Sequence, residues 1–232
     1  MQSPLPAILS NLQNAARAAG RPVPVLLAVS KTQPAGAVAA LAAQGQRAFG
    51  ENYVQEAVAK IQALEDACLE WHLIGHLQSN KAELAARYFD WVQSVDRTRL
   101  VTALARHRSP TQAPLNVLVQ VNIDDEASKH GCQPDAVPAL AAAIAAEPTL
   151  RLRGLMAIPA PWPEPARRQA AFERMHVLHQ QLQAVHPQAD TLSMGMSSDY
   201  AEAVAHGATL VRIGTALFGA RAVQADLKGA SA

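Results

Sequence analysis

The chain has 232 residues, of which half are hydrophobic and only 4% are aromatic. This length is enough for one large core, and α/β barrels of such a size commonly form one domain. The formal net charge is +1, with 20 basic and 19 acidic residues and no block of like charge, which excludes the basic footprint of a nucleic-acid-binding protein.

The sequence also predicts where the protein operates. No stretch of 18 uninterrupted apolar residues predicts a membrane span, and the first residues lack the basic start and long apolar run of a signal peptide. The two cysteines, Cys68 and Cys132, have no CxxC spacing. We therefore expect a cytoplasmic protein with reduced thiols and with neither a membrane nor a nucleic-acid partner.

Short apolar runs alternate with longer amphipathic stretches along the chain. A leading helix is expected over residues 5–19, where Gly20 and Pro22 end it. Strands are then expected at 23–30, 48–51, 70–75, 91–95, 116–122, 150–158, 191–195 and 210–215. Helices are expected at about 35–44, 53–65, 79–88, 97–108, 134–147, 166–185 and 198–206. Residues 159–165 hold four prolines and should be a loop, and residues 216–223 should be a short tail.

Strands that alternate with helices predict parallel βαβ units. A doubly wound open sheet is the rival architecture. Eight strands with their helices in one compact chain favour a closed barrel, because closure removes the edge strands. We expect one domain over residues 1–232, a single TIM-type (β/α)₈ barrel with an extra N-terminal helix.

Lys31 is the most informative candidate for chemistry. Residues that follow the strands of a parallel barrel meet at the end where active sites lie. Lys31 follows the first strand, so its amine should project over the barrel mouth. Partial burial disfavours the ammonium form of a lysine, and a neutral amine can condense with a carbonyl to form an imine. By position alone, a surface lysine that ends the strand is about equally acceptable.

A phosphate site is expected in the loops after the seventh and eighth strands, where barrels often bind phosphate. Ser197 and Ser198 place hydroxyls in the first loop, and Gly214 and Thr215 lie in the second, where glycine lets the backbone approach a ligand. Ordinary helix capping by Ser198, with Asp199 adding charge near the helix start, explains some of these residues equally well. Capping and phosphate binding are compatible.

Arg212 lies near the end of the eighth strand, where the mouth narrows. An arginine that faces a pyridine nitrogen keeps that nitrogen unprotonated, because arginine is always a donor. The ring would then be a weaker electron sink for carbanion chemistry. An ion pair with an aspartate or glutamate is the alternative role.

Seven stretches together resemble one known family. They are AVSKTQP (28–34), FGENYVQEA (49–57), WHLIGHLQSNK (71–81), VQVNIDDEASKHG (119–131), GLMAIP (154–159), LSMGMSSDYAEAV (192–204) and VRIGTALFGAR (211–221). They cover nearly the whole chain in the expected order. The sequence thus resembles the YggS/PROSC family of pyridoxal phosphate homeostasis proteins.

The resemblance implies a fold like the N-terminal barrel of alanine racemase, with pyridoxal 5′-phosphate (PLP) held as a Schiff base on the lysine. The serines, glycine and threonine of the site would contact the phosphate, the asparagine and methionine would line the pocket, and the arginine would lie near the ring. The cofactor-binding residues implied in this way are Lys31, Asn52, Met196, Ser197, Ser198, Arg212, Gly214 and Thr215.

The family is associated with PLP supply and amino-acid homeostasis and has no established catalytic activity. The resemblance therefore implies a protein that manages PLP and has no catalytic residues. We also expect a monomer, with PLP-dependent apo-enzymes as recipients of the cofactor. A PLP-dependent amino-acid racemase is the alternative. Racemases of the alanine racemase type add a β-rich domain whose tyrosine is the second base. The tyrosines here are Tyr53, Tyr88 and Tyr200, and the chain ends about 17 residues after the last expected strand, so we expect no second base.

Two histidine pairs and one further lysine are weaker signals. His72 with His76, and His176 with His179, have spacings that could supply two metal ligands on a helix. The first pair straddles a strand end, and the second has no third ligand at a matching spacing. We expect structural or surface histidines and no metal. Lys129, after the fifth strand, is expected to be a solvated loop lysine rather than an anion site.

Overall fold

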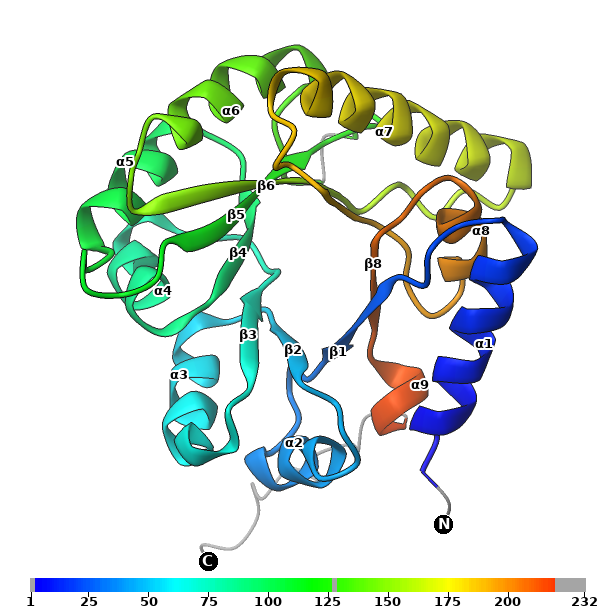
Figure 1. Ribbon diagram of the computed structural model, residues 1–232, viewed down its shortest axis with the longest axis horizontal. Helices are drawn as coiled ribbons and strands as arrows, with labels where there is room; N and C mark the ends of the chain where they lie inside the picture. Colours follow the sequence, from blue (N-terminus) through cyan, green and yellow to red (C-terminus); the bar gives the residue numbers. More distant parts are fainter. Residues whose placement is uncertain (1–2, 127–128, 220–232) are drawn as a thin grey trace, which may run out of the picture.

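Eight parallel strands close into a barrel in sequence order, and helices surround it (Figure 1). This is a computed structural model, and it describes residues 3–126 and 129–219. Closure is direct, because β1 pairs with β8 as well as with β2. The strands are β1 Val25–Val29, β2 Ala48–Glu51, β3 Glu70–Leu73, β4 Trp91–Val95, β5 Leu115–Val121, β6 Leu150–Ala157, β7 Thr191–Ser193 and β8 Leu210–Ile213. The predicted (β/α)₈ barrel is confirmed, and the open sheet is wrong.

The helices follow the strands as expected. The leading helix packs beside the last two helices of the described chain. The helices are α1 Leu5–Ala18, α2 Ala35–Ala42, α3 Val54–Ala63, α4 Ala82–Tyr88, α5 Thr98–His107, α6 Val137–Ala145, α7 Pro165–Val185, α8 Tyr200–Ala205 and α9 Thr215–Phe218. Single 3₁₀ turns occur at η1 Glu65–Ala67, η2 Ser79–Lys81 and η3 Pro134–Ala136. Among the described residues, no helix is long and apolar enough to cross a membrane.

The structure corrects three local expectations. The helix expected at 134–147 begins as a 3₁₀ turn, because Pro134 and Pro138 lack the amide hydrogens of a regular first turn. Part of the expected tail, as far as Phe218, belongs to α9, a helix too short to show a periodic pattern. Ser198 does not cap α8: the N-cap position is Asp199, whose carboxylate accepts the amide hydrogen of Met196 at 2.6 Å.

Side chains alternate between the barrel interior and the layer under the helices, as strand geometry requires. The larger apolar core lies in the outer layer between strands and helices. Two small apolar clusters remain apart from it, one around Leu27 and Leu210 and one around Trp91 and Leu118. Buried polar side chains occupy the rest of the interior, which is where the candidate site begins.

Candidate functional site

Lys31 lies at the carboxyl end of β1 and is half-buried. It lines a pocket of about 70 Å³ together with Gly214 and Thr215, which follow β8. The pairing of β1 with β8 explains this proximity, since it sets the two loops side by side. A Cβ atom on Gly214 would lie 3.3 Å from the carbonyl oxygen of Val29, so the second loop rests directly on the end of β1.

The loop after β7 is placed differently. Met196, Ser197 and Ser198 are all exposed, and they form a turn in which the amide of Tyr200 donates to the carbonyl oxygen of Met196 at 2.9 Å. None of the three lines the pocket of Lys31. Their contact with phosphate therefore stays a prediction, although their loop leaves the strand next to β8.

Asn52 also lies at this end of the barrel but lines another hollow, of about 420 Å³, with His76 and Lys81. Gly75 forms part of the same hollow, and any side chain there would collide with the carbonyl oxygen of Asn52. The structure thus packs the Asn52 backbone against the loop after β3. It does not bring Asn52 into the pocket of Lys31, and its role in cofactor binding stays a prediction.

Arg212 is 4% exposed and points into the barrel from β8. Its guanidinium donates to the hydroxyl oxygen of Ser193 at 2.7 Å and to the carbonyl oxygen of Ala157 at 2.8 Å. These bonds go to neutral oxygens instead of forming the carboxylate ion pair considered from the sequence. Burial lowers the pKa of Arg212 to about 10, with the charge of Asp199 opposing that shift, so the side chain stays cationic at neutral pH.

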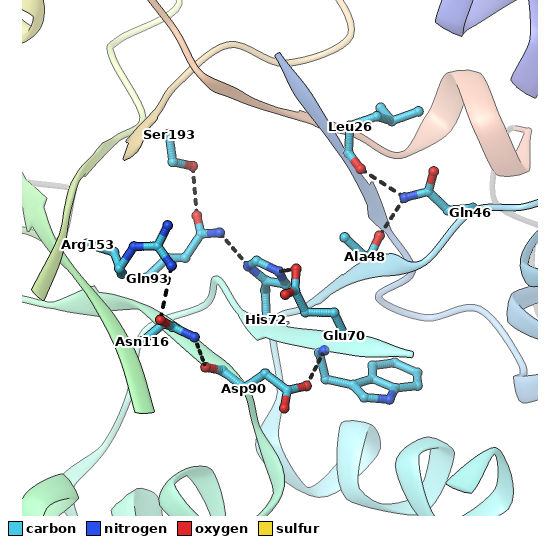
Figure 2. A network of polar contacts seen from close by, with 11 residues as sticks. Leu26, Gln46, Ala48, Glu70, His72, Asp90, Gln93, Asn116, Arg153 and Ser193 are labelled. Atoms are coloured by element: carbon cyan, nitrogen blue, oxygen red, sulfur yellow. Dashed lines mark hydrogen bonds and ion pairs between the residues drawn. The ribbon is translucent and has the colours of Figure 1, made fainter. Parts of the chain in front are cut away.

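A chain of hydrogen bonds runs from Arg212 to Ser193 and on through the barrel interior. Figure 2 shows the part of this chain from Ser193 to Glu70. The Ser193 hydroxyl donates to Oε1 of Gln93 at 2.7 Å, and Nε2 of Gln93 contacts Nδ1 of His72 at 2.9 Å. Nε2 of His72 then contacts Oε1 of Glu70 at 2.8 Å. Glu70 lines a hollow at the opposite, amino-terminal end of the strands. The chain therefore runs from Arg212 inside β8 to the amino-terminal end of the strands.

The direction of this chain follows from chemistry. A guanidinium only donates, so the Ser193 oxygen accepts from Arg212 and its hydrogen must go to Gln93. The Gln93 amide then donates to His72, which leaves the Nε2 hydrogen of His72 for the Glu70 carboxylate. Burial lowers the pKa of His72 although Glu70 opposes it, which agrees with a neutral ring. Every donor in the chain thus points toward Glu70 at the amino-terminal end of the strands.

Sequence reasoning named Arg212 as a site residue and His72 as a weak metal candidate. It missed Ser193, Gln93 and Glu70, and it did not predict the chain that links them. The signal was present, because a strand places alternate residues on its inner face. Polar residues at inner positions of β3, β4, β7 and β8 mark a polar interior. Their partners, however, depend on how the strands are set against one another.

A second polar cluster, formed by Ser30, Glu51 and Lys60, holds the backbone just before Lys31. The Ser30 hydroxyl donates to Oε1 of Glu51 at 2.5 Å, and Lys60 on α3 donates to the same oxygen at 2.8 Å. Lys60 also donates to the Ser30 carbonyl oxygen at 2.8 Å. Burial raises the pKa of Glu51, and the hydrogen bond from Lys60 is the largest opposing influence. This buried lysine therefore balances the charge of Glu51 and fastens the backbone just before Lys31.

The other side of the loop is held by Glu56. Its carboxylate accepts from Lys60 at 2.7 Å and from the amide of Thr32 at 2.6 Å. Thr32 has a φ of 64°, in the left-handed region that is unfavourable for a β-branched residue. The bonds on both sides of Lys31 hold this strained backbone in place, so the direction of the lysine is set by side chains from β2 and α3.

The remaining candidates have separate places. His179 is buried and contacts the Ala189 carbonyl oxygen at 2.8 Å, a structural role like that expected. Cys68 is exposed and Cys132 is buried, and both are free thiols. Lys129 lies in the loop after β5, where its amide donates to the Glu126 carbonyl oxygen at 2.9 Å. His76 is considered below.

Comparison with known proteins decides the family. The alanine racemase N-terminal domain family matches residues 4–222. A Pseudomonas aeruginosa protein named pyridoxal phosphate homeostasis protein is 53% identical over 216 residues, which cover 92% of this chain and 93% of that one. The chain belongs to the pyridoxal phosphate homeostasis protein family. The resemblance seen in the sequence is thereby confirmed.

Solved structures of related proteins agree with this family membership. PipY of Synechococcus elongatus without PLP has a TM-score of 0.84 and 39% identity, covering 93% of this chain and 98% of its own. PipY with PLP bound has a TM-score of 0.76 and 38% identity, covering 91% of this chain and all of its own. Alanine racemase of Corynebacterium glutamicum, at 21% identity and a TM-score of 0.64, is alike in fold alone; the match covers 97% of this chain and 64% of the racemase.

Proposed function

We propose that this member of the family binds PLP as a Schiff base on Lys31 and serves PLP homeostasis. The observation that carries the proposal is the shared pocket of Lys31, Gly214 and Thr215, which combines an amine with groups able to bind phosphate. Two comparisons support it: relatives over half identical are named pyridoxal phosphate homeostasis proteins, and PipY has been solved with PLP bound.

The chemistry of the pocket fits the cofactor. PLP supplies an aldehyde and a pyridine ring that can act as an electron sink. The Lys31 amine would condense with the aldehyde and release water. The Thr215 hydroxyl and the closely packed backbone of Gly214 would hold the phosphate, with Ser197 and Ser198 approaching from the loop after β7. Asn52 and Met196 would complete the wall.

Arg212 would face the pyridine nitrogen and donate to it. A donor at that position keeps the nitrogen unprotonated, which weakens the ring as an electron sink. We therefore infer a protein without efficient turnover, in agreement with the homeostasis name of its relatives. It would act as a single-domain cytoplasmic monomer and pass PLP to apo-enzymes. The racemases among its structural neighbours are too distant to favour racemisation.

The assignment of Lys31 is tested with purified protein. The visible spectrum should show an imine band that borohydride abolishes, and mass spectrometry should then find the pyridoxyl group on Lys31. Lys31→Ala should lose the band while remaining folded, whereas Lys81→Ala and Lys129→Ala should keep it. An adduct found only on Lys81, Lys129 or the buried Lys60 would refute the assignment.

A further inference from the structure

Two histidines and an aspartate meet at the rim of the barrel mouth. His76 follows β3, Asp96 follows β4, and His130 lies in the loop after β5. One possible ligand atom from each lies within 4.8 Å of the others, the one group of this kind found in residues 3–126 and 129–219. Nδ1 of His76 is 3.9 Å from Oδ2 of Asp96, and the imidazole rings of His76 and His130 stack with centroids 3.8 Å apart.

The exposure of these groups leaves them accessible to an ion from solvent. Both histidines are exposed, and Asp96 is partly buried. Arg97 binds Oδ1 of Asp96 at 2.5 Å, on the oxygen that is not turned to His76. Cys132, two residues after His130, is buried and is not a member of this group.

We propose that His76, Asp96 and His130 bind a divalent transition-metal ion of the zinc class. Two imidazole nitrogens and one carboxylate oxygen favour Zn²⁺, Co²⁺ or Ni²⁺ over Mg²⁺ and Ca²⁺, which prefer oxygen ligands. With bonds near 2.1 Å, tetrahedral ligand atoms lie about 3.4 Å apart. Both histidines are exposed, so side-chain rotation can bring the atoms that close without moving the strands.

The site would tie together three consecutive loops of the mouth. Three protein ligands leave a coordination position for water or for a group of another molecule. His76 also lines the hollow shared with Asn52, so that position would lie at the edge of this hollow. The metal would fasten the loop after β5 to the ends of β3 and β4, independently of the lysine that is proposed to hold PLP.

Zinc binding can be measured directly by calorimetry, with the visible spectrum of the Co²⁺ form as a second readout. The measurements use the full chain with Cys68→Ser, because the exposed thiol could bind zinc. They are made once with Lys31 intact and once with Lys31→Ala, which should carry no PLP that could chelate the metal. We expect one Zn²⁺ per chain in both backgrounds, removable by EDTA, and no comparable binding of Mg²⁺.

Variants locate the ion. His76→Ala, His130→Ala and Asp96→Asn should each weaken zinc binding at least about tenfold, whereas the exposed His107→Ala should leave it unchanged. Circular dichroism of the metal-free variants should match the parent. A chain that binds no zinc, or whose binding survives in the His76→Ala/His130→Ala double variant, would overturn the site. Neither outcome would touch the assignment of PLP to Lys31.

Discussion

The guanidinium of Arg212 donates a 2.7 Å hydrogen bond to the hydroxyl of Ser193 inside the barrel. Neither residue is more than 4% exposed. This bond starts a one-way series of donors that passes through Gln93 and His72 and ends at Glu70. The orientation of the arginine is therefore set by this series, which runs over β7, β4 and β3, and by its second bond to the Ala157 carbonyl oxygen on β6.

Gln93→Leu tests this dependence. The change leaves buried groups of Ser193 and His72 without a partner, so we expect the free energy of unfolding to fall by about 1–3 kcal/mol and the spectrum of bound PLP to change. Gln46→Leu is the matched control, because Gln46 is also buried but donates to the carbonyl oxygens of Leu26 and Ala48 (Figure 2). Equal spectral changes in both variants would contradict a positioning role.

The lowered pKa of His72 predicts how the stability of the protein depends on pH. Its pKa is lowered in the folded protein, so the unfolded chain binds more protons in the range between the two pKa values. Stability is then fully present above pH 6.5 and is lost as the pH falls, by up to about 1.4 kcal/mol per pH unit for one proton. Denaturant titrations from pH 7.5 to 5 should show this decline.

Two measurements separate His72 from the other histidines with lowered pKa values. The decline should be shallower in His72→Gln, with His76 and His179 accounting for what remains. Nitrogen-15 NMR should find the His72 hydrogen on Nε2. An Nδ1 hydrogen in the native protein would contradict the direction assigned to the chain.

Lys60 and Glu51 should show strong energetic coupling. Lys60→Met leaves the fully buried Glu51 carboxylate without its cation, which should cost about 3–5 kcal/mol of stability. The double variant Lys60→Met/Glu51→Gln should recover a large part of that loss, because no buried charge then lacks a partner. Chemical denaturation of the parent, both single variants and the double variant measures the coupling. Additive effects would mean that the two charges do not stabilise each other.

The phosphate assignment predicts a difference between two ligands. Replacing Ser197 and Ser198 together with alanine should weaken PLP binding by roughly two to four decades, at about 1.5–3 kcal/mol per hydrogen bond to a charged group. Binding of unphosphorylated pyridoxal should change much less. Because both serines are exposed and lie outside the Lys31 pocket, equal weakening of both ligands would assign them a role in the loop itself.

Efficient catalysis should be absent. Exchange of the Cα proton needs a stabilised carbanion, which a donor at the pyridine nitrogen disfavours. We expect the PLP-loaded protein to exchange the Cα proton of alanine and serine for deuterium at no more than trace rates, as followed by NMR. Rapid exchange that disappears in Lys31→Ala would restore the racemase hypothesis.

The sequence by itself determined the barrel and the place of Lys31 in it. Strand and helix periods, glycine and proline signals and the residue that follows each strand are local properties, readable without knowing what packs against what. They placed Lys31, Gly214 and Thr215 at the same end of the molecule, and the pairing of β1 with β8 brings them into one pocket. The short helix α9 was missed because four residues show no period.

Only the tertiary structure decided which polar side chains meet. Ser193 and Gln93 are 100 residues apart in sequence and bond because closure of the barrel turns both inward. Irregular register between Val92 and Val95 on β4 further changes which side chains face the interior. Lys60 is one of several polar residues on an amphipathic helix, yet its amine donates to the carbonyl oxygen of Ser30, the residue before Lys31. Such contacts depend on strand register and on the distance between elements, which no local pattern encodes.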